Sequence, residues 1–125
     1  MVAGRASDAQ KSAFDAVLAA SNAGFEAAKP GVTGGAVDAA SRAACAAAGF
    51  EQFPHHTGHG TGFRYHESRP QIVPDGEHVI AASQVIITEP GVYVEGLGGF
   101  RHEDNAVVTA DGAKVLATTS YGLDD

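Results

Sequence analysis

The sequence is poor in several residue types, and each shortage excludes a class of protein. Cys45 is the only cysteine among 125 residues, which excludes an internal disulfide framework and a metal site built from several thiolates. Only 8 lysines and arginines stand against 15 aspartates and glutamates, so the net charge is −7. This balance argues against nucleic-acid binding and against docking on an anionic membrane, because both require a basic surface.

Long apolar runs are also missing. No run approaches the roughly 20 residues that a membrane span requires, and the N-terminus shows no basic-then-apolar signal pattern. We therefore expect a cytoplasmic protein with no membrane association. The length fits one domain, so we treat residues 1–125 as a single unit.

Alanine is abundant, and it is concentrated in the first part of the chain. Residues 1–49 hold 18 of the 24 alanines and predict helices over about 7–48. Residues 50–118 hold all six histidines and most β-branched residues, and they predict strands and site loops. This order predicts an α+β fold in which two N-terminal helices pack on an antiparallel sheet.

Helix start and stop signals set the expected bounds of both helices. Ser7 followed by Gln10 fits a capping box, and Pro30 ends the first helix. The second helix is expected to begin after Thr33 and to stop at Gly49. The predicted inner faces are Phe14, Val17, Leu18 and Phe25 in the first helix, and Val37, Ala40, Ala44 and Ala47 or Ala48 in the second. We expect Cys45 to pack as a small apolar residue.

Four strands are expected in the second part of the chain. Their ranges are Gln84–Glu89, Gly91–Val94, Phe100–Thr109 and Lys114–Ala117. Ala110-Asp111-Gly112 predicts a hairpin turn between the last two.

Four of the six histidines lie within twelve residues of one another. They are interleaved with Gly58, Gly60 and Gly62, which allow the backbone to bend and to approach a ligand closely. Imidazole is both a metal ligand and a proton carrier near pH 7, so His55, His56, His59 and His66 are candidate site residues. The alternative is a set of surface histidines on a glycine-rich loop.

Two further groups of residues bring carboxylates to the ends of predicted strands. Glu89 follows an apolar strand and precedes Pro90, which holds it in an extended conformation. Alternation along a strand places Arg101 and Glu103 on one face, where the arginine would keep that carboxylate ionised. Alone, Glu89 also fits a solvated strand end, and Arg101 with Glu103 also fits a surface ion pair.

Taken together, His59, Glu89 and Glu103 offer one nitrogen and two carboxylates. That mixture suits Mn²⁺, Co²⁺, Fe²⁺ or Zn²⁺ rather than a soft metal. The three residues are therefore the predicted metal ligands, provided that the fold brings them to one point.

Three ordered motifs resemble a known family. They are His55-x-x-x-His59-Gly60-x-Gly62-x-x-x-His66-Glu67, then Thr88-Glu89-Pro90-Gly91, then Arg101-x-Glu103-Asp104. This arrangement is similar to the C-terminal half of the pita-bread metallopeptidases. It is most similar to the Xaa-Pro branch, which comprises prolidase (Xaa-Pro dipeptidase) and aminopeptidase P; creatinase and methionine aminopeptidase are more distant.

The resemblance implies a role for each matching residue. His59, Glu89 and Glu103 would bind divalent metal, and Glu89 would also act as general base on the attacking water. His66 would contact the substrate or the developing oxyanion, together with Tyr65 on the substrate side. His55 would assist proton transfer, and Arg101 and Asp104 would orient the metal-binding carboxylates. The implied reaction is hydrolysis of the Xaa-Pro bond in proline-containing peptides.

The resemblance also implies that the site is incomplete in this chain. The family uses two aspartates from a strand before the first helix, whereas Met1 to Gly4 stand where that strand should end, and Asp8 and Asp15 fall on the predicted helix. We therefore expect one metal ion or none, where the intact family site holds two, and little activity from 125 residues alone. A complementary upstream half would complete it. The alternatives are a non-catalytic half-fold that homodimerises to imitate the full fold, and a pseudoenzyme scaffold.

Overall fold

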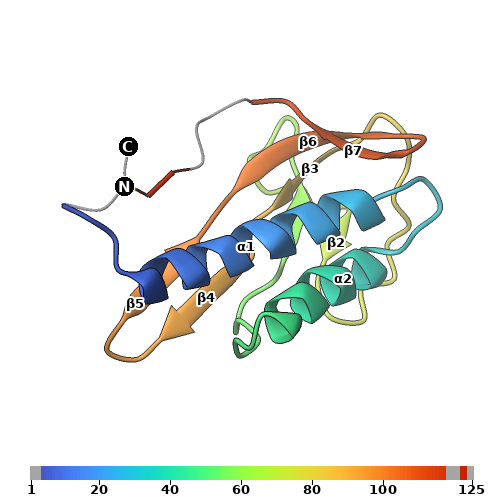
Figure 1. Cartoon of the computed structure of the whole chain (residues 1–125). Helices are drawn as coiled ribbons and strands as arrows, with labels where there is room; N and C mark the ends of the chain where they lie inside the picture. The colour runs from blue at the N-terminus through green and yellow to red at the C-terminus, as the bar shows by residue number, and fades with distance from the viewer. Residues whose placement is uncertain (1–3, 118–121, 124–125) are drawn as a thin grey trace.

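The computed structural model describes residues 4–117 and 122–123. The expected strand end at residues 1–3 and the expected boundary at residue 118 lie outside these residues. Two helices lie side by side on one face of the strands (Figure 1). The predicted α+β class is therefore confirmed. No helix among the described residues is long and apolar enough to cross a membrane.

Local signals in the sequence account for both helices. Helix α1 spans Asp8–Ala27, and Ser7 and Gln10 form the predicted capping box. Helix α2 spans Gly34–Ala47, with Thr33 as its N-cap. The chain leaves α2 through Gly49, whose φ of 84° favours glycine.

The buried face of α2 differs from the prediction. Val37 is buried as expected, but Ala40 and Ala44 are only half-buried and Ala47 and Ala48 are exposed. The residues that α2 buries are Gly34, Val37, Asp38, Ser41 and Cys45. The prediction selected alanines for the inner face, whereas the structure buries Ser41 beside Gly24 and buries Asp38, whose carboxylate accepts hydrogen bonds from Arg42 and Thr57.

A tight contact between the helices explains the position of Ser41. A side chain at Gly24 of α1 would place its Cβ 2.5 Å from the Ser41 hydroxyl, so this glycine makes room for α2. On α1 the buried residues include Val17 and Phe25 as predicted, whereas Phe14 and Leu18 are half-buried.

The strands form one antiparallel sheet of five strands and a separate pair. The order of the larger sheet is β2-β1-β3-β6-β7, and β4 pairs with β5. The strand bounds are β1 Gly58–Gly60, β2 Gln71–Ile72, β3 Val85–Thr88, β4 Gly91–Val94, β5 Gly98–Arg101, β6 Asp104–Thr109 and β7 Gly112–Val115. Strands β1 and β2 were not predicted, because two or three residues rich in glycine and polar side chains carry no strand pattern.

The predicted strand Phe100–Thr109 is interrupted at residues 102–103. The part before the break pairs with β4, and the part after it pairs with β3, so the chain passes between the two sheets here. The predicted strand Lys114–Ala117 begins earlier, at Gly112, because Thr109 pairs with Gly112 across a two-residue turn. Gly112 has a φ of 140°, which favours glycine.

Two apolar clusters join the layers. The larger aliphatic side chains, among them Ile72, Ile80 and Ile86, pack with Phe25 and Val37 between the helices and the five-stranded sheet. The second cluster is rich in alanine and includes Val17, Cys45, Phe53 and Val92. Cys45 is fully buried there, as predicted.

Candidate metal centre

Strand alternation places the central site residues on the sheet face opposite the helices. Ile86 belongs to the helix-facing core, and the Thr88 hydroxyl lies 2.9 Å from that of Ser21 on α1. Successive side chains of a strand point to opposite faces, so Ile87 and Glu89 point away from the helices. His59 pairs directly with Ile87 across β1 and β3, and it therefore lies on the same face as Glu89.

His59 is buried and has one nitrogen without a partner. Its side chain is 6% exposed. Nδ1 lies 2.8 Å from the carbonyl oxygen of Gly60; a carbonyl only accepts, so Nδ1–H donates. In the neutral ring, Nε2 is then the nitrogen with the lone pair, and this buried atom has no hydrogen-bond partner.

Glu89 lies beside that lone pair. Its side chain is 8% exposed, and Oε1 lies 3.6 Å from Nε2 of His59 and 2.8 Å from Nε2 of His56. The other oxygen, Oε2, lies 3.7 Å from the guanidinium of Arg101. We expected Arg101 to pair with Glu103; the ion pair that it makes in the structure is with Glu89.

Glu103 instead accepts a hydrogen bond from the phenol of Tyr65. This bond raises the pKa of Tyr65 above its ordinary value, because ionisation would place a second negative charge beside the Glu103 carboxylate. Tyr65 also contacts the ring of His59, with a centroid distance of 5.7 Å. Tyr65 thus lies between the two predicted ligands His59 and Glu103.

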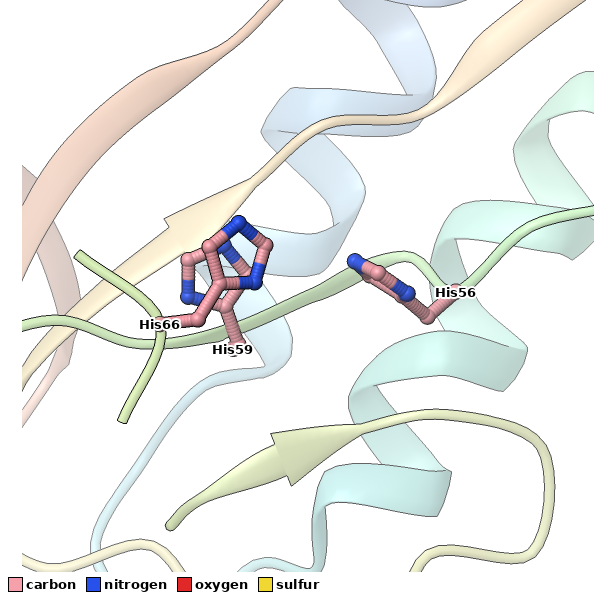
Figure 2. Close-up of side chains that lie close together, drawn as sticks. All are labelled: His56, His59 and His66. Atoms are coloured by element: carbon pink, nitrogen blue, oxygen red, sulfur yellow. The ribbon is translucent and has the colours of Figure 1, made fainter. Parts of the chain in front are cut away.

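Three imidazoles gather at this point (Figure 2). We call His56, His59 and His66 the imidazole cluster; each offers one ligand nitrogen, and these nitrogens lie within 4.8 Å of one another. His66 stacks on His59 with ring centroids 3.7 Å apart and an interplanar angle of 20°. One ring nitrogen of His56 points toward that stacked pair in Figure 2.

Two other predicted site residues lie apart from this point. Both ring nitrogens of His55 are engaged, Nδ1 with the carbonyl of His56 and Nε2 with the hydroxyl of Tyr93. Asp104 pairs with Thr88 in the sheet and lies 2.8 Å from Nε2 of His102. His102 in turn contacts Phe14 of α1, so this pair lies on the helix-facing side.

Sequence reasoning assigned no specific role to His56. Its position between His55 and the glycines was noted, but its contact with Glu89 spans 33 residues and depends on the pairing of β1 with β3. The only available signal was the run of two consecutive histidines.

A second buried polar group holds the segment before His59. We call Asp38, Arg42 and Thr57 the Asp38 network. Arg42 lies 2.8 Å from Asp38 and donates to the carbonyls of Phe53 and His55, while the hydroxyl of Thr57 donates to Asp38 over 2.6 Å. This network attaches α2 to the chain that leads into β1.

The donor set fits a divalent metal ion. A buried imidazole nitrogen with a free lone pair, next to a buried carboxylate, is the chemistry that such an ion requires. The hydrogen bond from Nδ1 of His59 to Gly60 fixes the ring with Nε2 available, as is usual for metal-binding histidines.

Comparisons with known proteins identify the relatives of the chain. The Xaa-Pro dipeptidase of Pyrococcus horikoshii is 38% identical over 124 residues, covering 98% of this chain and 35% of that protein. The crystal structure of the prolidase from the same organism superposes with a TM-score of 0.87 at 36% identity, covering 96% of this chain and 35% of that one. The crystal structure of the X-Pro aminopeptidase of Thermotoga maritima superposes with a TM-score of 0.86 at 33% identity, covering 95% of this chain and 34% of that one.

The expected fold is therefore confirmed as half of the pita-bread fold, and the chain spans about a third of the length of the relatives that it matches. The profile of Metallopeptidase family M24 matches residues 1–110. The chain belongs to this metallopeptidase family.

Proposed function

We propose that residues 1–125 form the C-terminal half of the catalytic domain of a peptidase that hydrolyses Xaa-Pro bonds with a divalent metal ion. The observation that carries this proposal is the unpartnered, buried Nε2 of His59, 3.6 Å from the Glu89 carboxylate. The similarity to Xaa-Pro dipeptidases, whose names state their substrate class, supports the choice of peptide bond.

His59, Glu89 and Glu103 would hold the metal. A divalent ion, Mn²⁺, Co²⁺, Fe²⁺ or Zn²⁺, supplies an acidified water and a polarised carbonyl when bound. Glu89 accepts the proton of the attacking water at Oε1 or Oε2, and Arg101 beside Oε2 keeps the carboxylate oriented.

The exposed residues near the cluster would face the substrate. Tyr65 is 60% exposed, and His66 is exposed next to it, so both can reach a bound peptide. His66 donates to the oxyanion as the carbonyl is attacked. His55 and Asp104 lie apart from the imidazole cluster. They would act through the residues that they contact, His55 through His56 and Asp104 through His102.

Complementation tests this proposal. The chain should be mixed with a separately produced upstream segment from the Pyrococcus horikoshii dipeptidase, and hydrolysis of an Xaa-Pro dipeptide should be followed with and without Mn²⁺ or Co²⁺. We expect metal-dependent hydrolysis from the mixture, loss of it with Glu89→Gln, and little hydrolysis from either part alone. A mixture that associates but remains inactive contradicts the proposal.

A homodimeric half-fold without catalysis is a second candidate. Leu116, which directly follows edge strand β7, is 57% exposed, and Phe63 in the segment after β1 is fully exposed. Exposed apolar side chains and sheet edges favour association. Light scattering at micromolar concentration tests it: a dimer mass that falls to the monomer mass in Phe63→Ser and Leu116→Ser supports this candidate, and a monomer mass for the unsubstituted chain excludes it.

A further inference from the structure

The imidazole cluster offers a metal site different in composition from the set of one histidine and two glutamates. Its three ligand nitrogens lie within 4.8 Å of one another, and all three come from residues 56–66. No residue outside this chain is needed to build it. The carboxylate of Glu89, 2.8 Å from His56 and 3.6 Å from His59, adds one oxygen at the same point.

His59 provides the fixed part of this site. Its ring is held by the bond from Nδ1 to Gly60 and by its place in the central part of the sheet. Its Nε2 is buried and has no partner, so binding a cation would satisfy an atom that the fold leaves unsatisfied.

The other two imidazoles can adjust to a cation. A Zn–N distance of about 2.0–2.1 Å in a tetrahedral site sets the nitrogens about 3.4 Å apart. From a separation of up to 4.8 Å, the nitrogens must therefore approach by up to about 1.4 Å. The His56 side chain is 41% exposed and His66 is exposed, so both can change rotamer at low cost. His66 also has to tilt out of its stack on His59, because the lone pairs of parallel rings do not converge.

The ligand types decide which cation fits. Three neutral imidazoles favour Zn²⁺, Cu²⁺ or Ni²⁺, whereas carboxylate-rich sites suit Mn²⁺ or Mg²⁺. The nearby Glu89 carboxylate balances one positive charge of the cation, and a single carboxylate with three nitrogens completes the four ligands that Zn²⁺ prefers.

We propose that His56, His59 and His66, with Glu89 beside them, bind one Zn²⁺ ion in this chain on its own. The site shares His59 and Glu89 with the centre of the proposed function, so the two cannot be filled independently. It differs in that it needs His56 and His66 but not Glu103.

Metal titrations of the full 125-residue chain test the proposal. Zn²⁺ binding is measured by calorimetry, and the visible absorption of bound Co²⁺ reports a four-coordinate site. The variants are His56→Asn, His66→Asn and Glu103→Gln, with His78→Asn as the matched control, since His78 lies outside the imidazole cluster. Circular dichroism in the presence of a chelator establishes that each variant is folded.

We expect one Zn²⁺ per chain, tighter binding of Zn²⁺ than of Mn²⁺, and a loss of affinity of about tenfold or more for His56→Asn and for His66→Asn. Glu103→Gln and His78→Asn should bind Zn²⁺ as the unsubstituted chain does. If Glu103→Gln weakens binding while His56→Asn does not, the cation occupies the glutamate set and the proposal is wrong, although the proposed function stands. No Zn²⁺ binding by the unsubstituted chain also overturns it, and complementation then still decides the proposed function.

Discussion

The Asp38 network and the imidazole cluster each contain a buried polar side chain, Asp38 in the first and His59 in the second, and Thr57 of the network lies between His56 and His59 in sequence. The two buried side chains differ in how completely their hydrogen bonds are satisfied. Asp38 receives Arg42 on one oxygen and Thr57 on the other, and the remaining nitrogens of Arg42 reach two carbonyls. In the imidazole cluster, Nε2 of His59 has no partner. Burial alone therefore does not separate a structural polar group from a functional one.

Satisfaction of hydrogen bonds makes the distinction only together with ligand chemistry, because the Ser41 hydroxyl is also buried without a partner but has no second ligand group beside it, among the described residues, that would bind a cation. A buried polar group with every partner in place stabilises a fold or is neutral, whereas one without a partner costs stability and persists where it serves another purpose. On this reasoning the Asp38 network holds the segment before β1, and His59 of the imidazole cluster is the candidate ligand-binding group.

Removing Arg42 should have the largest effect. Arg42→Ala leaves the Asp38 carboxylate, which is 2% exposed, without its counter-charge and leaves two carbonyls without donors. We expect a loss of about 3–5 kcal/mol in the free energy of unfolding, measured by urea denaturation.

The matched comparison is His59→Asn, in which the amide nitrogen takes the place of Nδ1 and can still donate to the Gly60 carbonyl, while the unpartnered Nε2 is removed. We expect it to cost about 1 kcal/mol or less. Equal losses in the free energy of unfolding for the two variants would show that His59 stabilises the fold as much as Arg42 does, and would contradict this distinction between the two groups.

Adding metal should act on the imidazole cluster alone. Zn²⁺ that binds the folded chain stabilises it by about 2.7 kcal/mol when the free ion is at 100 times its dissociation constant. Urea denaturation with Zn²⁺ and with a chelator measures this gain. His59→Asn should abolish it, whereas Arg42→Lys, which retains the charge beside Asp38, should keep most of it. A gain that persists in His59→Asn would place the ion elsewhere.

The sequence allowed the helices and the fold class to be predicted because their signals are local. The capping residues Ser7 and Thr33 act within three positions, and their bonds to Gln10 and Ala36 are present in the structure. The apolar run of β3, followed by Pro90, likewise predicted that Glu89 stands at a strand end. In these elements the local preference of the sequence is the same as the structure that the whole fold requires, so local rules were sufficient to predict them.

The parts that could not be predicted depend on pairing across long distances. Strand β1 exists because Gly58 lies against Thr88, where any side chain would place its Cβ 1.9 Å from the carbonyl oxygen of Ile87. The contact of His56 with Glu89 follows from that pairing, and no pattern within the histidine-rich segment could have indicated it. Ligand chemistry made His59, Glu89 and Glu103 candidates, and the family resemblance, not local physics, indicated that they share one site.

Thr57 connects the two regions, and its substitution should have an intermediate effect. Thr57→Val keeps the shape of the side chain but removes the 2.6 Å hydrogen bond to the Asp38 carboxylate at a fully buried position. Hydrogen bonds to charged groups contribute about 2 kcal/mol, and we expect that loss in urea denaturation, together with weaker Zn²⁺ binding.

Thr61→Val is the matched control, because Thr61 lies two residues beyond His59 on the other side and is half-buried. It should change the free energy of unfolding by no more than about 0.5 kcal/mol. If Thr57→Val leaves Zn²⁺ affinity unchanged, the Asp38 network does not hold the imidazole cluster in place.

The smallest expected effect concerns Cys45, which is buried in the alanine-rich cluster. Burial raises the pKa of its thiol above the ordinary value of 9.0, with a smaller opposing effect of Arg42. Above pH 9 the thiol ionises in the unfolded chain before it does so in the folded one, so the unfolded state binds fewer protons and stability falls as pH rises. The slope of the free energy of unfolding against pH from one such group is at most about 1.4 kcal/mol per pH unit.

Urea denaturation between pH 8 and 10 (roughly the range that brackets the thiol) should therefore show a steeper fall in the free energy of unfolding for the unsubstituted chain than for Cys45→Ala. Tyrosines and lysines titrate equally in both chains, so the difference isolates the thiol. Identical slopes would mean that Cys45 ionises as readily in the fold as in water, which a fully buried thiol among alanines should not do.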